Sequence, residues 1–346
     1  MGIERSETAT NDLFASFHPS PYIKKTTVHP LHLKLPATSA NLGPGFDAIG
    51  LAMSFYLTID AEPAAAFSIE ASGRNPDLCG ALDRNLILDT YRDVLTFAGR
   101  PITPLDLRLQ NEIPLGMGCG SSAAALLAGV LLANHFGSLG WTGYQAMEEA
   151  CRREGHPDNV AACWLGGMTV SAAMQPIPEA SETIATASFA NDGERFDWKL
   201  LLVIPPASLS TEKARALLPE AYSRADAVTN VQNTALLVAA FAYGRADLLR
   251  IAMQDRIHQP YRAAVCPLLP LLLPLAGQRS PQHSILGAAL SGAGPAVLLI
   301  YQGDAEAVRR AVSEKLQSIE AELLEATISS GTRIQVTKVP FTNVSG

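Results

Sequence analysis

The sequence has little that would direct it to a membrane or a nucleic acid. Its longest apolar stretches, such as Pro267–Gly277, are short and broken by proline, which argues against a membrane span. The formal net charge of −7 gives no general attraction to nucleic acid or to anionic lipid. Any site for a phosphate group therefore has to be local and built from particular loops.

The cysteines form no recognisable framework. There are five of them, an odd number, with no Cys-x-x-Cys pair, so neither a set of disulfides nor a zinc site is expected. A reducing cytoplasm fits this composition best. Residues 1–27 lack an apolar core of the signal-peptide type and are expected to form a flexible, dispensable extension.

The first half of the chain alternates between strand and helix patterns. With 346 residues, 48% of them apolar, the chain is long and apolar enough for two well-buried domains. Alternating apolar positions predict strands, and helical spacing predicts helices. The expected strands are Val28–Thr38, Leu51–Asp60 and Leu105–Ile113, and the expected helices are Asn85–Gly99, Ser121–Asn134 and Trp141–Gly155.

A polar stretch after Gly167 separates this half from a second one, and we expect a boundary near residue 197. The second half predicts a strand, helices, a strand, a charged helix and a last strand. The expected strands are Trp198–Pro206, Pro295–Tyr301 and Arg333–Val339. The expected helices lie between Thr211 and Met253 and from Ala305 onward. The mixture predicts an α+β fold with an N-terminal unit, 28–197, and a C-terminal unit, 198–346.

Three glycines lead directly into an apolar helix in PLGMGCGSSAAALLAGVLLAN, residues 114–134. A tight turn that lets the helix pack closely would explain them. So would an anion site, because a helix N-terminus offers unpaired N–H groups and a positive dipole end. The stretch fits neither the P-loop, since it has no Gly-Lys-Ser/Thr, nor the dinucleotide fingerprint. Ser121 and Ser122 favour the anion site, because their hydroxyls can bind phosphate or magnesium.

Three more loops combine glycine with polar side chains beside a buried element. They are PATSANLGPGFDAIG (residues 36–50), EGHPDNVAACWLGG (residues 154–167) and LSGAGPAVLLI (residues 290–300). Ordinary turns, helix caps or a structural histidine would explain each of them singly. Four such loops in one chain favour a phosphate cradle with backbone N–H donors, a magnesium-binding carboxylate and a hydroxyl group.

In order and spacing, PATSANLGPGFD, PLGMGCGSSAA, EGHPDNVA and LSGAGPAV resemble the motifs of the GHMP kinases, and within them those of the homoserine kinase family. The resemblance implies an N-terminal domain like ribosomal protein S5 domain 2 and a ferredoxin-like C-terminal domain. It implies transfer of the γ-phosphoryl group of ATP to the side-chain hydroxyl of L-homoserine, in threonine biosynthesis. The expected partners are L-homoserine, ATP and Mg²⁺, with a homodimer as the expected assembly and neither nucleic acid nor membrane.

The resemblance also assigns roles to residues. The nucleotide positions would be Asn85, Pro114, Leu115, Gly116, Met117, Gly118, Cys119, Gly120, Ser121 and Ser122. Magnesium would be held by Glu154 with Ser122 or, alternatively, Ser121. The amino-acid site would consist of Asn41, Asp47, His156, Asn159, Arg215 and Arg262. The chain departs from the family pattern at Cys119, where leucine is common, and at Gln259, where glutamate is frequent.

Phosphoryl transfer depends more on positioning and charge neutralisation than on proton removal. Because the loop has no lysine, neutralisation would fall to magnesium, the helix N-terminus and backbone donors. The expected catalytic set is Ser122, Glu154, Asp158 and Asn159. Asp158 and Asn159 would orient the hydroxyl, and proton abstraction by Asp158 stays open. The substrate carboxylate suits Arg262 or Arg215 as a bidentate partner, and its ammonium group suits Asp47.

Three alternatives remain at this point. A related kinase could act on mevalonate or another small alcohol, although Asp47 favours a substrate that carries an ammonium group. A non-catalytic, ligand-binding relative is disfavoured by Ser122, Glu154 and Asp158, which are all present. A dehydrogenase would have to bind NAD.

Overall fold

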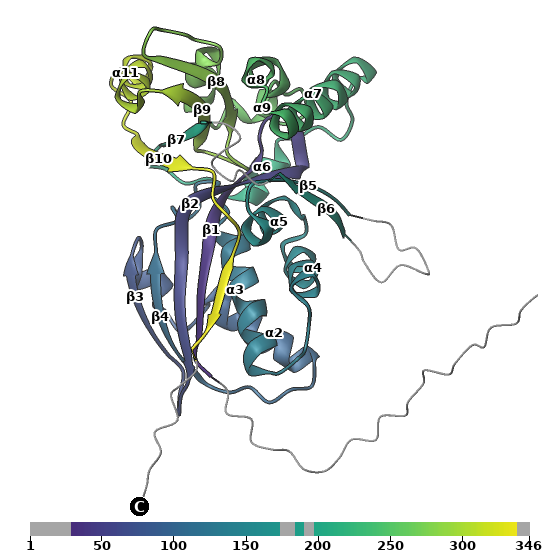
Figure 1. The fold of residues 1–346 in the computed structure, drawn as a ribbon, viewed down its shortest axis with the longest axis vertical. Helices are drawn as coiled ribbons and strands as arrows, with labels where there is room; N and C mark the ends of the chain where they lie inside the picture. Colours follow the sequence, from purple (N-terminus) through teal and green to yellow (C-terminus); the bar gives the residue numbers. More distant parts are fainter. Residues whose placement is uncertain (1–28, 174–183, 190–196, 338–346) are drawn as a thin grey trace, which may run out of the picture.

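The computed structural model describes residues 29–173, 184–189 and 197–337, arranged around two β-sheets that follow one another along the long axis of the molecule (Figure 1). The predicted N-terminal extension, 1–27, lies outside these ranges. Mixed sheets with helices confirm the predicted α+β fold class.

The first sheet has seven strands, in the order β11-β1-β2-β4-β3, with β5 paired to β2 and β6 paired to β5. Its strands are β1 (Leu31–Asn41), β2 (Gly45–Pro63), β3 (Ser68–Gly73), β4 (Leu105–Asn111), β5 (Met168–Ala173), β6 (Ile184–Phe189) and β11 (Arg333–Val336). β4 shows why such strands form, because its residues alternate between the buried core and the exposed face. The three strands predicted here overlap β1, β2 and β4, and β3, β5 and β6 were not predicted.

Helices cover one face of this sheet (Figure 1). They are α2 (Leu86–Phe97), α3 (Ser121–Phe136), α4 (Gly143–Glu154) and α5 (Asp158–Leu165), and the short α1 (Pro76–Cys79) follows β3. α3 is apolar on all sides and mostly buried, which confirms the prediction of a central helix. It packs closely on α2, because a Cβ atom on Gly129 would come within 2.6 Å of the carbonyl oxygen of Ile87.

The second sheet has four strands, in the order β10-β7-β9-β8, and every neighbouring pair is antiparallel. In chain order these strands are numbers 4-1-3-2, which is the arrangement expected of a ferredoxin-like unit. The strands are β7 (Lys199–Ile204), β8 (His283–Leu290), β9 (Val297–Gly303) and β10 (Glu322–Thr327). The helices are α6 (Thr211–Ala216), α7 (Arg224–Tyr243), α8 (Ala246–Ala252), α9 (Gln259–Arg262), α10 (Leu268–Leu272), η1 (Leu273–Leu275) and α11 (Ala305–Leu316).

The end of the chain departs from the predicted division into two consecutive units. β11 pairs antiparallel with β1, from Leu31 opposite Val336 to Lys34 opposite Arg333. It therefore lies in the first sheet (Figure 1), although the prediction assigned all residues after 197 to the second unit. Local periodicity predicted the strand, but only long-range pairing decides to which sheet a strand belongs.

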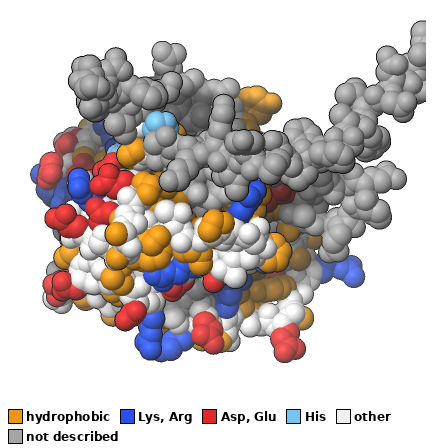
Figure 2. Space-filling model, turned by 90° about the horizontal axis from the view of Figure 1, so that it is seen from below, with side chains coloured by type: hydrophobic (Ala, Val, Ile, Leu, Met, Phe, Trp, Pro, Cys, Tyr) orange, Lys and Arg blue, Asp and Glu red, His pale blue; other side chains and the backbone are white. Residues whose placement is uncertain are grey.

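Two observations concern the hydropathy of the helices and the charge of the surface. No helix in the described part of the chain is long and apolar enough to cross a bilayer. On the face seen in Figure 2, acidic and basic side chains are interspersed among apolar and neutral ones. The described residues of that face form no large patch of one charge.

Candidate active site

The four glycine-containing loops meet at one end of α3. The Ser291 hydroxyl lies 2.7 Å from the carbonyl oxygen of Gly118 and 2.9 Å from the hydroxyl of Ser39. The Thr38 hydroxyl donates to Oδ1 of Asn159 over 2.7 Å. Segments that lie more than 250 residues apart in the sequence, such as Ser39 and Ser291, thus share one polar cluster.

The loop before α3 turns its carbonyl groups into the fold. The carbonyl oxygens of residues 116, 117, 118 and 119 accept, in order, from Leu209 N–H, Ala296 N–H, the Ser291 hydroxyl and Thr38 N–H. In the described structure the N–H groups of residues 116 to 123 have no acceptor. They line the start of a 16-residue helix, where the dipole is positive. This arrangement can bind an anion.

The glycines of this loop are also structurally required. Gly116, Gly118 and Gly120 all have positive φ, at 70°, 79° and 69°. A Cβ atom on Gly118 would come within 2.1 Å of the Ser291 carbonyl oxygen, and one on Gly120 within 1.8 Å of Thr38 Oγ1. The structure therefore shows the close packing, and this packing is compatible with an anion site on the same backbone.

A cleft of about 150 Å³ lies in front of the loop. All six residues assigned to the amino-acid site line it, together with Gly116, Gly118, Cys119, Gly120, Ser121, Ser122, Glu154 and Asp158. The Cys119 side chain is only 1% exposed and burial raises its pKa to about 12, so it is a packing residue at this position.

Ser122 and Glu154 lie together at this cleft. Oγ of Ser122 donates to Oε2 of Glu154 over 2.8 Å, although the two residues belong to α3 and α4. Burial raises the pKa of Glu154 above its usual value, and the Ser122 hydrogen bond and the charge of His156 only partly oppose that rise. A cation next to this carboxylate would favour its charged form.

Asp158 organises its neighbours at the start of α5. Its Oδ1 accepts from His156 Nδ1 over 2.6 Å and from the backbone N–H of Asn159 over 2.7 Å. Burial by itself lowers the pKa of His156, but the hydrogen bond and charge of Asp158, with Glu154 and Asp47 nearby, raise it above its usual value. In the described part of the chain, Oδ2 of Asp158 has no hydrogen-bond partner and remains available to a bound hydroxyl.

The two arginines are already engaged, which changes the expected binding of a carboxylate. Arg215 donates through both terminal nitrogens to Asp47, over 2.9 and 2.7 Å, and so occupies the carboxylate expected to bind the ammonium group. Arg262, which is 1% exposed, donates from Nε to Ala214 O and from Nη1 to Gly292 O and His258 Nδ1. Neither guanidinium offers the free two-pronged edge that the prediction assumed. In the described structure, the guanidinium nitrogens of this pair without an acceptor are Nε of Arg215 and Nη2 of Arg262.

A second cavity, of about 310 Å³, adjoins the cleft at Ser121 and Ser122, which line both. Its other walls are largely apolar and include Leu115, Ile113 and Ala125. Asn85 also lines it, but its side chain caps α2 and binds two loop carbonyls, so all its hydrogen-bonding groups are used within the protein. Pro114 and Met117, assigned to the nucleotide, line neither of these two cavities.

Several residues of this site were quoted in the motifs but given no role. Thr38, Ser39 and Ser291 hold the loops together, and Phe46 lies between the arginines, with its ring centre 5.5 Å from the guanidinium carbon of each. Their place in motifs that contain glycine was the only sequence signal for the first three. Gln259, the departure from the family pattern, makes no hydrogen bond to the Arg262 side chain in the described structure, and its Oε1 accepts from the N–H of Leu290.

Several known proteins are similar to this chain in sequence or in fold. Residues 85–167 match "GHMP kinases N terminal domain" and residues 236–318 match "GHMP kinases C terminal". The homoserine kinase of Solibacter usitatus is 46% identical over 301 residues, which cover 86% of this chain and 94% of that protein. The homoserine kinase of Deinococcus radiodurans is 39% identical over 272 residues, covering 79% and 84%. A crystal structure of homoserine kinase from Cytophaga hutchinsonii superposes with a TM-score of 0.70 at 22% identity, over 91% of this chain and all of that one.

Proposed function

The chain belongs to the homoserine kinase family of the GHMP kinases, and from this premise we propose how its residues transfer the γ-phosphoryl group of ATP to the side-chain hydroxyl of L-homoserine. The observation that carries the assignment is the loop of residues 116–123, whose N–H groups are free of acceptors in the described structure and which lies between two cavities. In this proposal one cavity takes the nucleoside, the loop takes the phosphates and the other cavity takes the amino acid.

The nucleoside would occupy the apolar cavity of about 310 Å³, with its phosphates directed past Ser121 and Ser122 onto the N-terminus of α3. Apolar walls suit a purine base, and the positive helix end suits the phosphate charge. Replacing Ala125, on the cavity wall, by leucine should raise the KM for ATP several-fold and leave the KM for homoserine unchanged. An unchanged KM for ATP would show that the base lies elsewhere.

Ser122 and Glu154 would hold Mg²⁺, which neutralises phosphate charge in this reaction class. The pair fits the ion, because adjacent ligands of an octahedral Mg²⁺ at 2.0–2.1 Å lie about 2.9 Å apart. The two side-chain oxygens are already 2.8 Å apart. Both are hard oxygen donors, and the desolvated carboxylate would gain a counter-charge.

The acceptor hydroxyl would bind to Oδ2 of Asp158, close to Asn159, which Thr38 and the Asp158 carboxylate hold in place. The substrate carboxylate would bind Nη2 of Arg262, and the ammonium group would share Asp47 with Arg215. These contacts use all three functional groups of homoserine. Positioning of this kind is the main catalytic contribution that a protein makes to phosphoryl transfer.

An ADP-release assay with homoserine, 4-hydroxybutyrate and mevalonate tests the assignment. Homoserine should be the efficient substrate, because the other two lack an ammonium group for Asp47. Efficient turnover of mevalonate or 4-hydroxybutyrate with homoserine ignored would refute the homoserine assignment.

Replacing Glu154 by glutamine should lower kcat by orders of magnitude and raise the Mg²⁺ concentration needed for half-maximal rate. Glu149→Gln is the matched control, because Glu149 lies on the same helix but pairs with Arg152 and Arg153 outside the cleft. Equal activity of the two variants would place the metal on another carboxylate.

The assembly, the compartment and the domain boundary near residue 197 remain proposals. The five cysteines are all free thiols, and four of them are buried, which supports a reducing cytoplasm. Val228 and Val231 on α7 are 48% and 69% exposed and offer apolar surface for a homodimer. Light scattering of the purified protein decides between a monomer and a dimer.

A further inference from the structure

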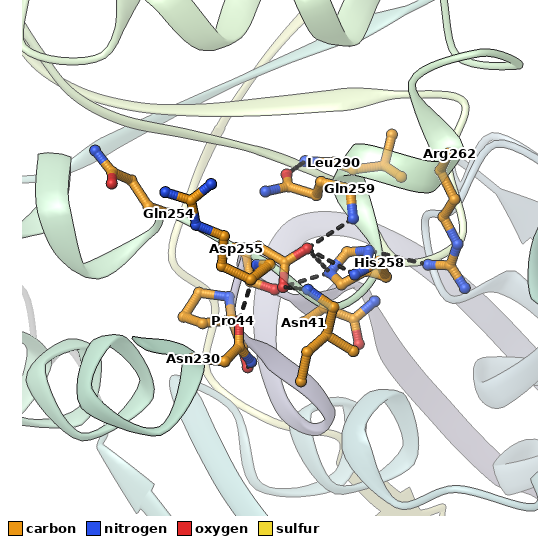
Figure 3. A network of polar contacts seen from close by, with 12 residues as sticks. Asn41, Pro44, Asn230, Gln254, Asp255, His258, Gln259, Arg262 and Leu290 are labelled. Atoms are coloured by element: carbon orange, nitrogen blue, oxygen red, sulfur yellow. Dashed lines mark hydrogen bonds and ion pairs between the residues drawn. The ribbon is translucent and has the colours of Figure 1, made fainter. Parts of the chain in front are cut away.

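One buried histidine joins two parts of the substrate end of the cleft. His258 precedes α9 and has no solvent-exposed surface. Its Nε2 lies 2.8 Å from the carbonyl oxygen of Gly43, and its Nδ1 lies 3.2 Å from Nη1 of Arg262 (Figure 3). Gly43 belongs to the turn between β1 and β2, and this turn leads to Asp47.

The two partners fix the protonation state of the imidazole. A carbonyl oxygen can only accept, so the hydrogen lies on Nε2, and a guanidinium can only donate, so Nδ1 presents its lone pair. Burial also lowers the pKa of His258; the charge of Asp255 opposes this and that of Arg262 adds to it. Asp255 does not take a proton from Nε2, because that pair is 3.6 Å apart and the carboxylate accepts the N–H groups of residues 257, 258 and 259.

The turn that His258 contacts has an unusual backbone. Asn41, Leu42 and Asp47 have positive φ, at 73°, 45° and 55°, in a region that residues other than glycine rarely adopt. The neighbouring carbonyl of Pro44 accepts from the side chains of Asn230 and Thr234 on α7. Such a conformation persists only where surrounding contacts hold it.

His258 also determines which part of Arg262 is free. Three acceptors use Nε and Nη1 of this guanidinium: Ala214 O, Gly292 O and His258 Nδ1. Nη2 has no acceptor in the described structure, and Arg262 is one of the residues that line the cleft. The ring of Phe46, next to Asp47, stacks on the imidazole with its centre 5.3 Å away. The histidine therefore contacts both the arginine and the turn that carries the aspartate.

We infer that His258, as a neutral imidazole, is a positioning residue for the substrate end of the cleft. It fixes the distance between the nitrogen of Arg262 that binds the substrate carboxylate and the carboxylate of Asp47 that binds the ammonium group. This distance sets the selectivity for an alcohol that carries both charges. The inference rests on the proposed placement of homoserine in this cleft. It predicts that losing His258 weakens recognition of both charged groups of the substrate, although His258 contacts neither.

Three replacements of His258 separate its two contacts. Glutamine can keep a donor near the position of Nε2 for Gly43, asparagine can keep an acceptor near the position of Nδ1 for Arg262, and leucine keeps neither. Gln259→Met is the matched control, because Gln259 follows His258 directly and is also buried, but its side chain binds Leu290 and lines no part of the cleft. A general loss of stability would affect the control as well.

Each variant is assayed with homoserine, with 4-hydroxybutyrate, which lacks the ammonium group, and with 3-aminopropan-1-ol, which lacks the carboxylate. His258→Leu should lower kcat/KM for homoserine about tenfold or more, the effect of losing a hydrogen bond to a charged group. It should lower the preference for homoserine over both analogues and leave the KM for ATP within twofold. Asparagine and glutamine should give intermediate losses, and the control should leave the preferences unchanged.

Equal losses on all three substrates, or a homoserine preference that stays at the wild-type value in the asparagine and glutamine variants, would overturn the inference. If the leucine variant fails to fold, these two variants decide. Absence of homoserine turnover in the wild type would instead refute the proposed function.

Discussion

Replacing Asn85 tests whether this residue stabilises the fold or binds the nucleotide. It is 6% exposed and uses both ends of its side-chain amide. Oδ1 caps α2 by accepting from the N–H groups of Ile87 and Leu88, and Nδ2 donates to the carbonyls of Cys79 and Ala81, each over 3.0 Å. The resemblance assigned this residue to the nucleotide, whereas its contacts are those of a residue that connects a loop to a helix.

Replacing Asn85 by alanine removes all four hydrogen bonds. Loss of the cap costs about 1 kcal/mol, and each carbonyl left without a donor costs about 1 kcal/mol. The free energy of unfolding should therefore fall by about 3 kcal/mol, roughly a hundredfold change in the folding equilibrium. Urea titrations followed by circular dichroism measure this change.

Asn85→Ser is the matched variant, because serine keeps a capping oxygen but is too short to reach the two carbonyls. It should recover about 1 kcal/mol of the loss. The KM for ATP should change little in Asn85→Ser. It should change more in Asn85→Ala, because α2 then lacks its N-terminal cap. A loss of stability below about 1 kcal/mol in alanine together with a tenfold rise in the KM for ATP would refute this reasoning and favour direct contact with the nucleotide.

Two further predictions concern the loop and the ionisable groups. Gly120→Ala should lower the melting temperature and raise the KM for ATP more than Gly116→Ala does. The new Cβ atom at 120 would lie 1.8 Å from Thr38, whereas one at 116 would lie 3.3 Å from Ser208. Equal melting temperatures and equal KM values for the two variants would contradict this prediction. Asp158→Asn should lower the pKa of His156, measured by NMR titration, because the carboxylate that raises it is gone. The interaction that raises a histidine pKa stabilises the folded protein below the pKa of the unfolded state, and this stabilisation is lost as the pH rises through the pKa of the folded state. Asp158→Asn should therefore lower the free energy of unfolding most at acid pH.

The sequence was most informative where a pattern is local. The helix from Ser121 and the strand at Leu105 follow from periodicity, and both form within two residues of their predicted ends. β3 and β10 were not predicted, because β3 has only intermediate and exposed residues and β10 buries only Ala326. Their stability comes from pairing with β4 and β7, which no local pattern encodes.

For the candidate site, too, the sequence predicted the local features and missed the long-range contacts. Motifs identified the residues of the cleft, because glycines and polar side chains in short loops are a local signal. The hydrogen-bond partners of these side chains could not be predicted from the sequence. Arg215 and Arg262 were assigned to a carboxylate ligand, yet the structure gives most of their donors to Asp47 and to backbone carbonyls. His258 received no role, because its contact with Gly43, 215 residues away in the sequence, is made only in the fold.

The glycine loop is prepared for an anion by contacts from both halves of the chain. Its carbonyls are held by Thr38 from β1 and by Leu209, Ser291 and Ala296 from the second half. Because every carbonyl from 116 to 119 has a donor elsewhere, the loop is held in place without a ligand, and in the proposed function it would need little reorganisation to bind phosphate. Leu209 lies shortly before α6, which carries Arg215, so the phosphate loop and the amino-acid end of the cleft share one frame. A displacement of either half would disturb both binding sites together, which is why the proposed transfer requires the two sheets to form one unit.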